Sequence, residues 1–231
     1  MIFPTVNPIF SAPSASISLK GYQSIQEVGT VAPISDNFST GYNAGAITIA
    51  GKKQADRGGV QIVAGSKLLY GSNKVEVLPT VVIAGSMNYY YRVSYSQGPQ
   101  PKDSKGKNYS TPLAAGIVDS SAISITGYVP AYSGLVTTSI ITEAVIKSMM
   151  KSISAKKTIK VAGPISEQFV CFAAPVGWSV SNIKDSNNFD VTSSYATSTV
   201  AVTGLDGKTV NYTVYLSGKM TQPGTYFVNF N

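Results

Sequence analysis

Apolar and polar residues alternate in short runs along much of this chain. Ile17 and Leu19 alternate with serines. Val60 and Ile62 are separated by one polar residue, as are Val75 and Val77. Alternation with a period of two places successive side chains on opposite faces of a strand, so each run predicts a β-strand. Glycines and polar turn residues interrupt the runs. The pattern therefore predicts short strands joined by turns.

The clearest predicted strand is the aromatic segment 87–95. Tyr89, Tyr91, Val93 and Tyr95 share one face of it, and the polar side chains face the other way. A loop rich in turn formers and without an apolar anchor follows at 98–108. We expect strands to resume near 117–118 and at 123–128.

One segment predicts a helix. No glycine or proline occurs from Ser139 to about Ser152, and Ile141, Val145 and Met149 are spaced four residues apart. An acidic residue in the first turn and lysines later in the segment agree with the helix dipole. Lys156, Lys157 and Lys160 then form a basic spacer. A phosphate site is one interpretation of these lysines, and a solvated helix end and linker is the favoured one.

A second β-region is predicted from near Thr158 to the end of the sequence. Val200 and Val202 form one arm of a hairpin, and an alternating run beginning at Val210 forms the other. Asp206-Gly207 between the arms is a strong hairpin signal. The last predicted strand is 226–230.

These elements predict a mainly β protein with two antiparallel β-sandwich-like domains, joined by a linker with one short α-helix. The predicted boundaries are an extended proline-rich arm at 1–16, an N-terminal β-domain at 17–135, a helix and basic linker at 136–160, and a C-terminal β-domain at 161–231.

The predicted arm combines prolines with large apolar side chains. Pro4, Pro8 and Pro13 exclude a helix. Its apolar residues are too numerous for a solvated tail. We expect the arm to dock either on its own domain or on a neighbouring subunit. The apolar residues are Ile2, Phe3, Val6, Ile9 and Phe10.

Composition narrows the classes of function. Only 13% of the residues are charged, and the net charge is +7, with Arg57 and Arg92 as the only arginines. Proteins that read nucleic acids usually depend on the bidentate guanidinium, so no nucleic-acid partner is expected. Dispersed lysines that keep the surface soluble account for the charge.

Candidate chemistry is sparse. The chain has no histidine, which removes the commonest general base and metal ligand. Its single cysteine, Cys171, lies in an apolar run typical of a buried thiol. Two carboxylate pairs could serve glycoside hydrolysis, Asp185 with Asp190 and Asp103 with Asp119, although Asp is also a common turn former. We expect no enzyme activity, no cofactor and no metal.

The N-terminal residues lack the basic region and continuous apolar core of a signal peptide, and no stretch is long enough to span a membrane. We therefore expect synthesis in a cytoplasm. The 14 tyrosines suit sheet packing and subunit interfaces, and a host surface glycan is a less favoured ligand.

Several strings resemble modules of bacteriophage tail, baseplate and fibre proteins. The likeness covers most of residues 22–231. In the first half the strings are Glu27-Val-Gly-Thr, Tyr89-Tyr-Tyr-Arg-Val-Ser-Tyr, Gly98-Pro-Gln-Pro-Lys-Asp-Ser-Lys-Gly-Lys, Ala115-Gly-Ile and Ile125-Thr-Gly-Tyr. In the second half they are an apolar strand with Pro175 and Trp178, then Ile183-Lys-Asp-Ser-Asn-Asn-Phe-Asp-Val, Tyr212-Thr-Val-Tyr and a terminal aromatic strand.

The resemblance implies a β-rich structural protein of the virion that is commonly trimeric and has no catalytic residues. The chain lacks a host-facing tip and a long triple-stranded β-helix repeat, so a connector, collar or fibre-base position is expected. A head fibre or capsid decoration protein and a carbohydrate-binding adhesin remain alternatives, and a polysaccharide-degrading enzyme is the third class.

The expected function is self-assembly and docking to other virion proteins, with a homotrimer favoured. The apolar residues expected at the interfaces are Ile2, Phe3, Ile9, Phe10, Tyr89, Tyr91, Ile141, Val145 and Met149.

Overall fold

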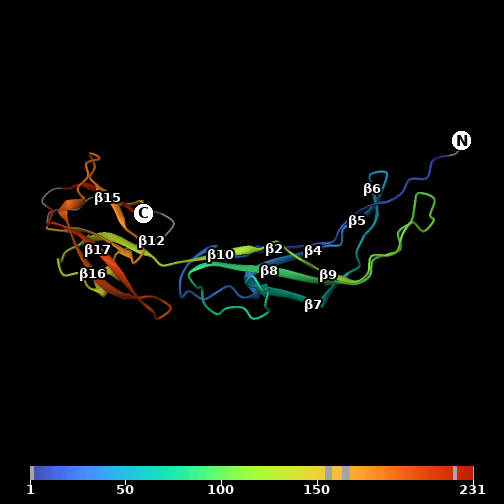
Figure 1. The fold of residues 1–231 in the computed structure, drawn as a ribbon, viewed down its shortest axis with the longest axis horizontal. Coiled ribbons are helices and arrows are strands. Elements are labelled where there is room, and N and C mark those ends of the chain that lie inside the picture. Colours follow the sequence, from blue (N-terminus) through green and yellow to red (C-terminus); the bar gives the residue numbers. More distant parts are fainter. Residues whose placement is uncertain (1–2, 154–157, 163–166, 221–222, 231) are drawn as a thin grey trace. The chain divides into compact units, whose positions relative to one another are not determined.

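The structure is a computed structural model that describes residues 3–153, 158–162, 167–220 and 223–230. It is mainly β, as predicted, with antiparallel sheets and, in these described residues, one α-helix (Figure 1). The chain forms two compact units. Unit 1 comprises Met1–Ser24, Ala32–Thr80 and Ser86–Thr126, and unit 2 comprises Ile25–Val31, Val81–Gly85 and Gly127–Asn231.

This division differs from the predicted boundaries in two ways. Unit 2 begins at Gly127 and includes the segment predicted as a linker at 136–160, and two short early segments also belong to it. Within unit 2, the Val28 amide donates to the Tyr128 carbonyl at 2.9 Å, and the Gly29 amide donates to the Val82 carbonyl at 2.9 Å. Strand β3 (Ile25–Glu27) precedes these contacts, and Val82 is fully buried. The two segments are therefore held by backbone pairing that no local pattern reveals.

A long two-stranded ribbon forms one layer of unit 1. Strands β1 (Ile9–Ser11) and β2 (Ser14–Leu19) pair with β5 (Ala46–Ile49) and β4 (Phe38–Asn43), respectively. The register continues from one pair to the next, because Ser11 faces Ala46 and Ser14 faces Asn43. The predicted arm is thus partly a strand from Ile9 onward. The short 3-10 turn η1 (Ser35–Asn37) precedes β4, and β6 (Lys52–Ala55) pairs with β5.

A sheet centred on β8 (Gly85–Tyr95) forms the other layer of unit 1. Strand β8 pairs with β7 (Gln61–Tyr70) on one side. On its other side it pairs with β9 (Gly116–Asp119) and β10 (Ile123–Tyr128). The predicted alternation is confirmed, because Met87, Tyr89, Val93 and Tyr95 are buried. The Tyr89 ring lies 5.1 Å from the Phe38 ring, and the Tyr95 ring stacks on the Tyr42 ring at 5.9 Å. One face of β8 therefore packs against the ribbon.

Unit 2 contains two packed sheets. The larger has the strand order β12 (Met150–Ser152), β11 (Ala131–Val136), β14 (Phe169–Pro175), β17 (Thr209–Ser217) and β16 (Tyr195–Thr203). The smaller has the order β13 (Thr158–Ala162), β18 (Thr225–Phe230) and β15 (Val180–Lys184), and the 3-10 turn η2 (Thr192–Ser194) precedes β16.

Strand β14 is buried on both of its faces. Val170, Phe172 and Ala174 face a core shared with the smaller sheet, while Cys171 and Ala173 face a second core beneath the helix. A continuous apolar run is typical of such a strand. The predicted buried thiol is confirmed, because Cys171 is fully buried and burial raises its pKa to about 12.

The helix is shorter than predicted. Helix α1 spans Glu143–Ser148, and the Thr142 side chain caps its N-terminus by accepting from the Val145 amide at 3.4 Å. The predicted helix continued to about Ser152, but Met150–Ser152 form β12 and pair with β11. Pairing with a distant strand therefore outweighs the local helical pattern.

The predicted hairpin is confirmed. Val202 pairs with Val210 and Thr203 pairs with Thr209. The Asp206 carboxylate accepts from the Lys208 amide at 3.1 Å, and Gly207 has a φ of 74°. Such a positive φ favours glycine. Asp206 therefore supplies the side-chain acceptor of the turn, and Gly207 supplies its left-handed backbone conformation. The predicted terminal strand is β18.

Candidate assembly surface

The large apolar side chains of the arm that the structure describes are exposed, whereas Pro8 is buried. The side chains of Phe3 and Ile9 are each 72% exposed, and Ile2 lies outside the described residues. Phe10 is held beneath the Arg57 guanidinium, whose carbon lies 4.2 Å from the ring centre. The Val6 amide donates to the Ser104 hydroxyl at 2.8 Å. The arm therefore contacts its own unit and also presents apolar side chains to the outside.

Tyr89 and Tyr91, the strand residues predicted at an interface, have separate environments. Tyr89 is fully buried within unit 1, which removes it from any contact with a partner. Tyr91 is partly buried, and its hydroxyl accepts from the Gln61 side-chain amide at 2.5 Å. The prediction for Tyr89 was wrong because its apolar face covers the ribbon of its own chain.

Ile141, Val145 and Met149, the helix residues predicted at an interface, pack inside unit 2. Met149 belongs to the core beneath α1, and Ile141 and Val145 pack against that core. Their spacing reflects one buried face of a short helix. The surface of this segment is instead formed by its charged residues, such as the Glu143–Lys147 ion pair at 2.7 Å.

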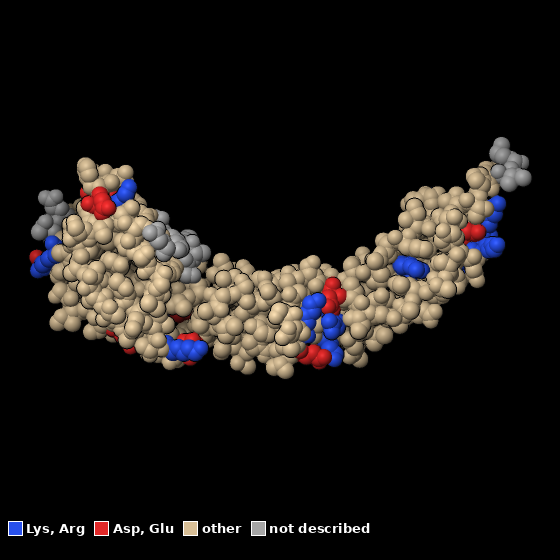
Figure 2. Space-filling model, in the orientation of Figure 1, with Lys and Arg blue, Asp and Glu red and all other residues tan. Residues whose placement is uncertain are grey.

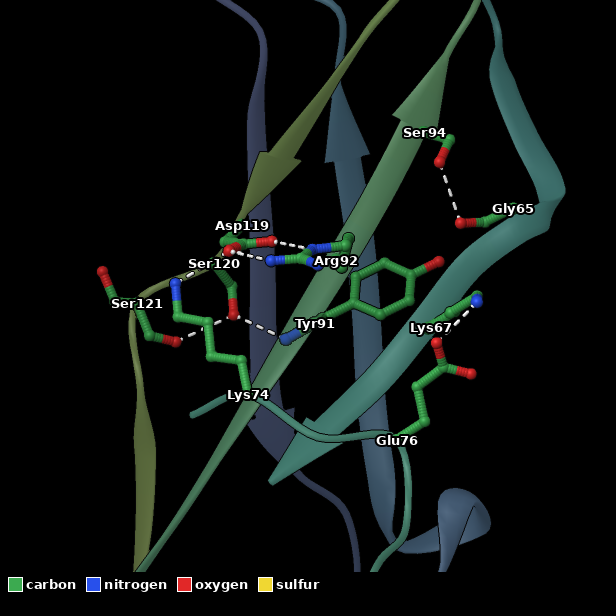
Figure 3. A network of polar contacts seen from close by, with 10 residues as sticks. All are labelled: Gly65, Lys67, Lys74, Glu76, Tyr91, Arg92, Ser94, Asp119, Ser120 and Ser121. Carbon is green, nitrogen blue, oxygen red and sulfur yellow. Dashed lines mark hydrogen bonds and ion pairs between the residues drawn. The ribbon is translucent and has the colours of Figure 1, made fainter. Parts of the chain in front are cut away.

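The outer face of β8, opposite the ribbon, carries a row of charged groups (Figure 3). Asp119 on β9 lies directly across from Arg92, and its carboxylate accepts from the Arg92 Nε at 2.8 Å and Nη2 at 3.0 Å. Lys74, from the connection after β7, donates to the same carboxylate at 2.7 Å. Asp119 thus joins three parts of unit 1.

This arrangement strongly favours the ionised form of Asp119. The hydrogen bonds from Arg92 lower the pKa of Asp119 to about 2, and burial opposes this shift less strongly. The same pairing raises the pKa of Arg92. Lys67 lies across the ladder from Arg92 and pairs with Glu76 at 2.6 Å. The row therefore holds three cations and two carboxylates, and every one of these groups is in an ion pair.

An apolar row lies two residues further along the same face of β8. Ser94 is flanked by Ile62 on β7 and by Ile117 on β9, and Val60 precedes Ile62 by one step of the alternation. The exposed fractions are 75% for Val60, 44% for Ile62 and 63% for Ile117. We call Val60, Ile62 and Ile117 the apolar face. Neighbouring exposed apolar side chains of this kind are typical of interaction surfaces.

A bulge in β7 adds to the apolar face. Ile62 pairs with Ser94 but Lys67 pairs with Arg92, so residues 63–66 protrude from the ladder. The Ser94 hydroxyl donates to the Gly65 carbonyl at 2.8 Å and fixes the bulge (Figure 3). Val63 in the bulge is 77% exposed. A bulge blocks pairing along this edge, so a partner would contact side chains there and not the ladder.

The carboxylate pairs considered for hydrolysis have structural contacts instead. The Asp185 carboxylate accepts from the Asn187 and Phe189 amides at 2.9 Å each, and Asp190 accepts from the Thr192 amide at 2.9 Å. Asp103 accepts from two amides of its own loop. Within the described residues, no group of three or more Asp, Glu or Cys side chains could hold a metal ion.

The described lysines of the predicted basic spacer are separated. Lys151 pairs with Glu27 at 2.7 Å, which raises the pKa of Lys151, and Lys160 lies over the Phe227 ring at 5.8 Å. Lys156 and Lys157 lie outside the described residues. Figure 2 shows that charged side chains on one face of the molecule occur in small groups of both signs between broad uncharged areas.

A cavity of 710 Å³ in unit 1 offers the strongest case for a sugar. Polar groups of Asn43, Asp56 and Gln61 line it, with Tyr42 as its aromatic residue. The Tyr42 ring is stacked on Tyr95 and its hydroxyl donates to the Gly59 carbonyl at 3.1 Å, so one ring face and the hydroxyl are already engaged within the chain.

Comparisons of the chain with protein-family models, with curated proteins and with solved structures found no match. In the part of the chain that the structure describes, no helix has the length and apolar character needed to cross a membrane.

Proposed function

We propose that this chain is a non-enzymatic structural component of a bacteriophage virion, in the tail, baseplate or fibre base, made in the host cytoplasm. It acts by associating with copies of itself, as a trimer, and with neighbouring virion proteins. The sequence resemblance supports the assignment to a virion, and the apolar face of unit 1 supports association with other subunits. The apolar face is the single observation that carries the proposal.

The apolar face favours association because water solvates its side chains poorly. Fully burying one exposed valine or isoleucine contributes about 1.5–3 kcal/mol. Three such side chains with Val63 beside them would supply several kilocalories per mole to an interface. The ion-paired row of Arg92, Asp119 and Lys67 lies next to them and suits the polar rim that surrounds an interface core.

The proposal is tested by the mass of the full chain in native solution. We expect the wild type to be a homo-oligomer at micromolar concentration and Ile117→Lys to dissociate at least about tenfold more readily, because it buries a charge in the interface. The matched control is Lys105→Ala, a change on an exposed loop of the same unit. A monomeric wild type would contradict self-assembly.

The virion part of the proposal has its own test. Antibodies against the purified chain should label particles isolated from a lysate of infected cells, at a repeated position on the tail or its base. Labelling of the head would favour the alternative of a head fibre or decoration protein. Particles that lack the chain would contradict the virion assignment.

A carbohydrate-binding adhesin is the second candidate, and the cavity beside Tyr42 is the observation in its favour. Binding of a host glycan by the wild type that Tyr42→Ala abolishes would support it. Binding that Tyr42→Ala leaves intact would exclude this cavity as the sugar site.

A further inference from the structure

Strand β16 is an open edge of the larger sheet in unit 2. It is nine residues long and pairs with β17 along one side only. The Thr203 amide donates to the Glu143 carboxylate at 2.9 Å, which places Thr203 among the residues whose backbone groups point away from β17. Because these directions alternate along an antiparallel strand, Thr197, Thr199 and Ala201 also point outward.

The open stretch of the edge is bounded at both ends. At one end the Tyr195 amide donates to the Thr192 carbonyl, and at the other the Thr203 amide is taken by Glu143. Between them Thr197, Thr199 and Ala201 are exposed. In the described structure their outward amides and carbonyls have no hydrogen-bond partner. The two boundaries lie at equal distances from Thr199 in the sequence.

This edge lacks the features that usually prevent pairing. In the sheets of three or more strands, the other edge strands are only three or four residues long, contain a lysine, or have a register shift. Strand β16 contains no charged residue, no proline and no register shift. Natural proteins generally protect long edges by such features, so an unprotected edge indicates a strand partner.

We propose that β16 pairs antiparallel with β16 of a second copy of this chain, about a two-fold axis at Thr199. The register places Thr199 opposite its counterpart and Thr197 opposite Ala201, and each facing pair exchanges two backbone hydrogen bonds, about six in all. The facing side chains are small and uncharged, and threonine pairs across strands are favourable. The larger sheet then continues from one copy into the other.

A second copy fits this edge better than the chain's own arm. The arm contains Pro4 and Pro8, which have no amide to donate to a ladder, and the Val6 amide is already bonded to Ser104. The same stretch on a second copy offers matching groups at matching spacing. The inference rests on the proposed self-assembly and adds a second, separate surface to it.

The test compares the full-length wild type with Thr199→Pro. Proline at this position removes an outward amide and leaves the bonds between β16 and β17 intact. If β16 joins the trimers proposed above in pairs, the wild type contains two trimers. We then expect the variant to have half the mass of the wild type in native solution, with an unchanged thermal midpoint. Thr199→Ser, which keeps the amide, should retain the wild-type mass.

A second proline variant tests whether the effect depends on the direction in which the replaced amide points. Ser198→Pro removes an amide that points toward β17, and it should lower the thermal midpoint where Thr199→Pro does not. Equal masses for wild type and Thr199→Pro would overturn the edge pairing. If Ile117→Lys then dissociates the same oligomer, the proposed assembly function stands without the edge, whereas a monomeric wild type would overturn both.

Discussion

The central strands of the two units are covered differently. In unit 2, β14 has its own chain on both faces, with Phe172 in one core and Cys171 in the other. In unit 1, β8 packs against the ribbon on one face, and the other carries a charged row beside exposed isoleucines. Unit 2 thus buries both apolar faces of its central strand within its own chain. Unit 1 leaves exposed apolar side chains that association would bury. Ion pairs connect the strands on the same outer face.

The largest expected effect tests the core of unit 2. Phe172→Ala should destabilise unit 2 by about 3–5 kcal/mol, because it leaves a cavity where Phe172 is fully buried. Trp178 is the only tryptophan and its ring lies 5.1 Å from Phe230 in the same core, so its fluorescence follows the unfolding of unit 2. Amide exchange along β8 should stay as in the wild type. A shared loss of protection in both units would mean that they do not unfold separately.

A smaller effect is expected from the charged row of unit 1. Asp119 has a lowered pKa when folded, so its contribution is present above its ordinary pKa and is lost as the pH falls from about 4 to 2. Asp119→Asn should therefore cost about 2 kcal/mol near pH 6, and most of this difference should be lost by about pH 2. Calorimetric unfolding of both proteins across this range measures it. A difference that does not change with pH would point to packing at Asp119 instead of charge.

Local patterns predicted the elements whose determinants are local. The alternation at 87–95 marks a strand with a buried aromatic face, and Asp206-Gly207 marks the turn between β16 and β17. The helix was predicted too long because no glycine or proline ends its pattern before about Ser152, while the pairing of β12 with β11 depends on residues far away in the chain.

The surface was harder to predict than the fold, because exposure depends on which face another layer covers. The alternation of Val60 with Ile62 is visible in the sequence, but its exposure depends on the ribbon packing against the opposite face of β8. Tyr89 was predicted at an interface because alternation does not reveal which face of β8 the ribbon covers. Its side chain is buried against the ribbon. The open edge of β16 follows from the strand order of the sheet, which alternation does not contain.

The smallest expected effect on folding belongs to the apolar face. Ile117→Lys should change the free energy of unfolding of unit 1 by no more than about 0.5 kcal/mol, because the side chain is already 63% exposed in the folded unit. Calorimetry under conditions where the variant is monomeric measures this change. The same substitution is expected to weaken association at least about tenfold. A large loss of stability in the monomer would show that Ile117 supports its own unit, and the contrast between the two units would then fail at this residue.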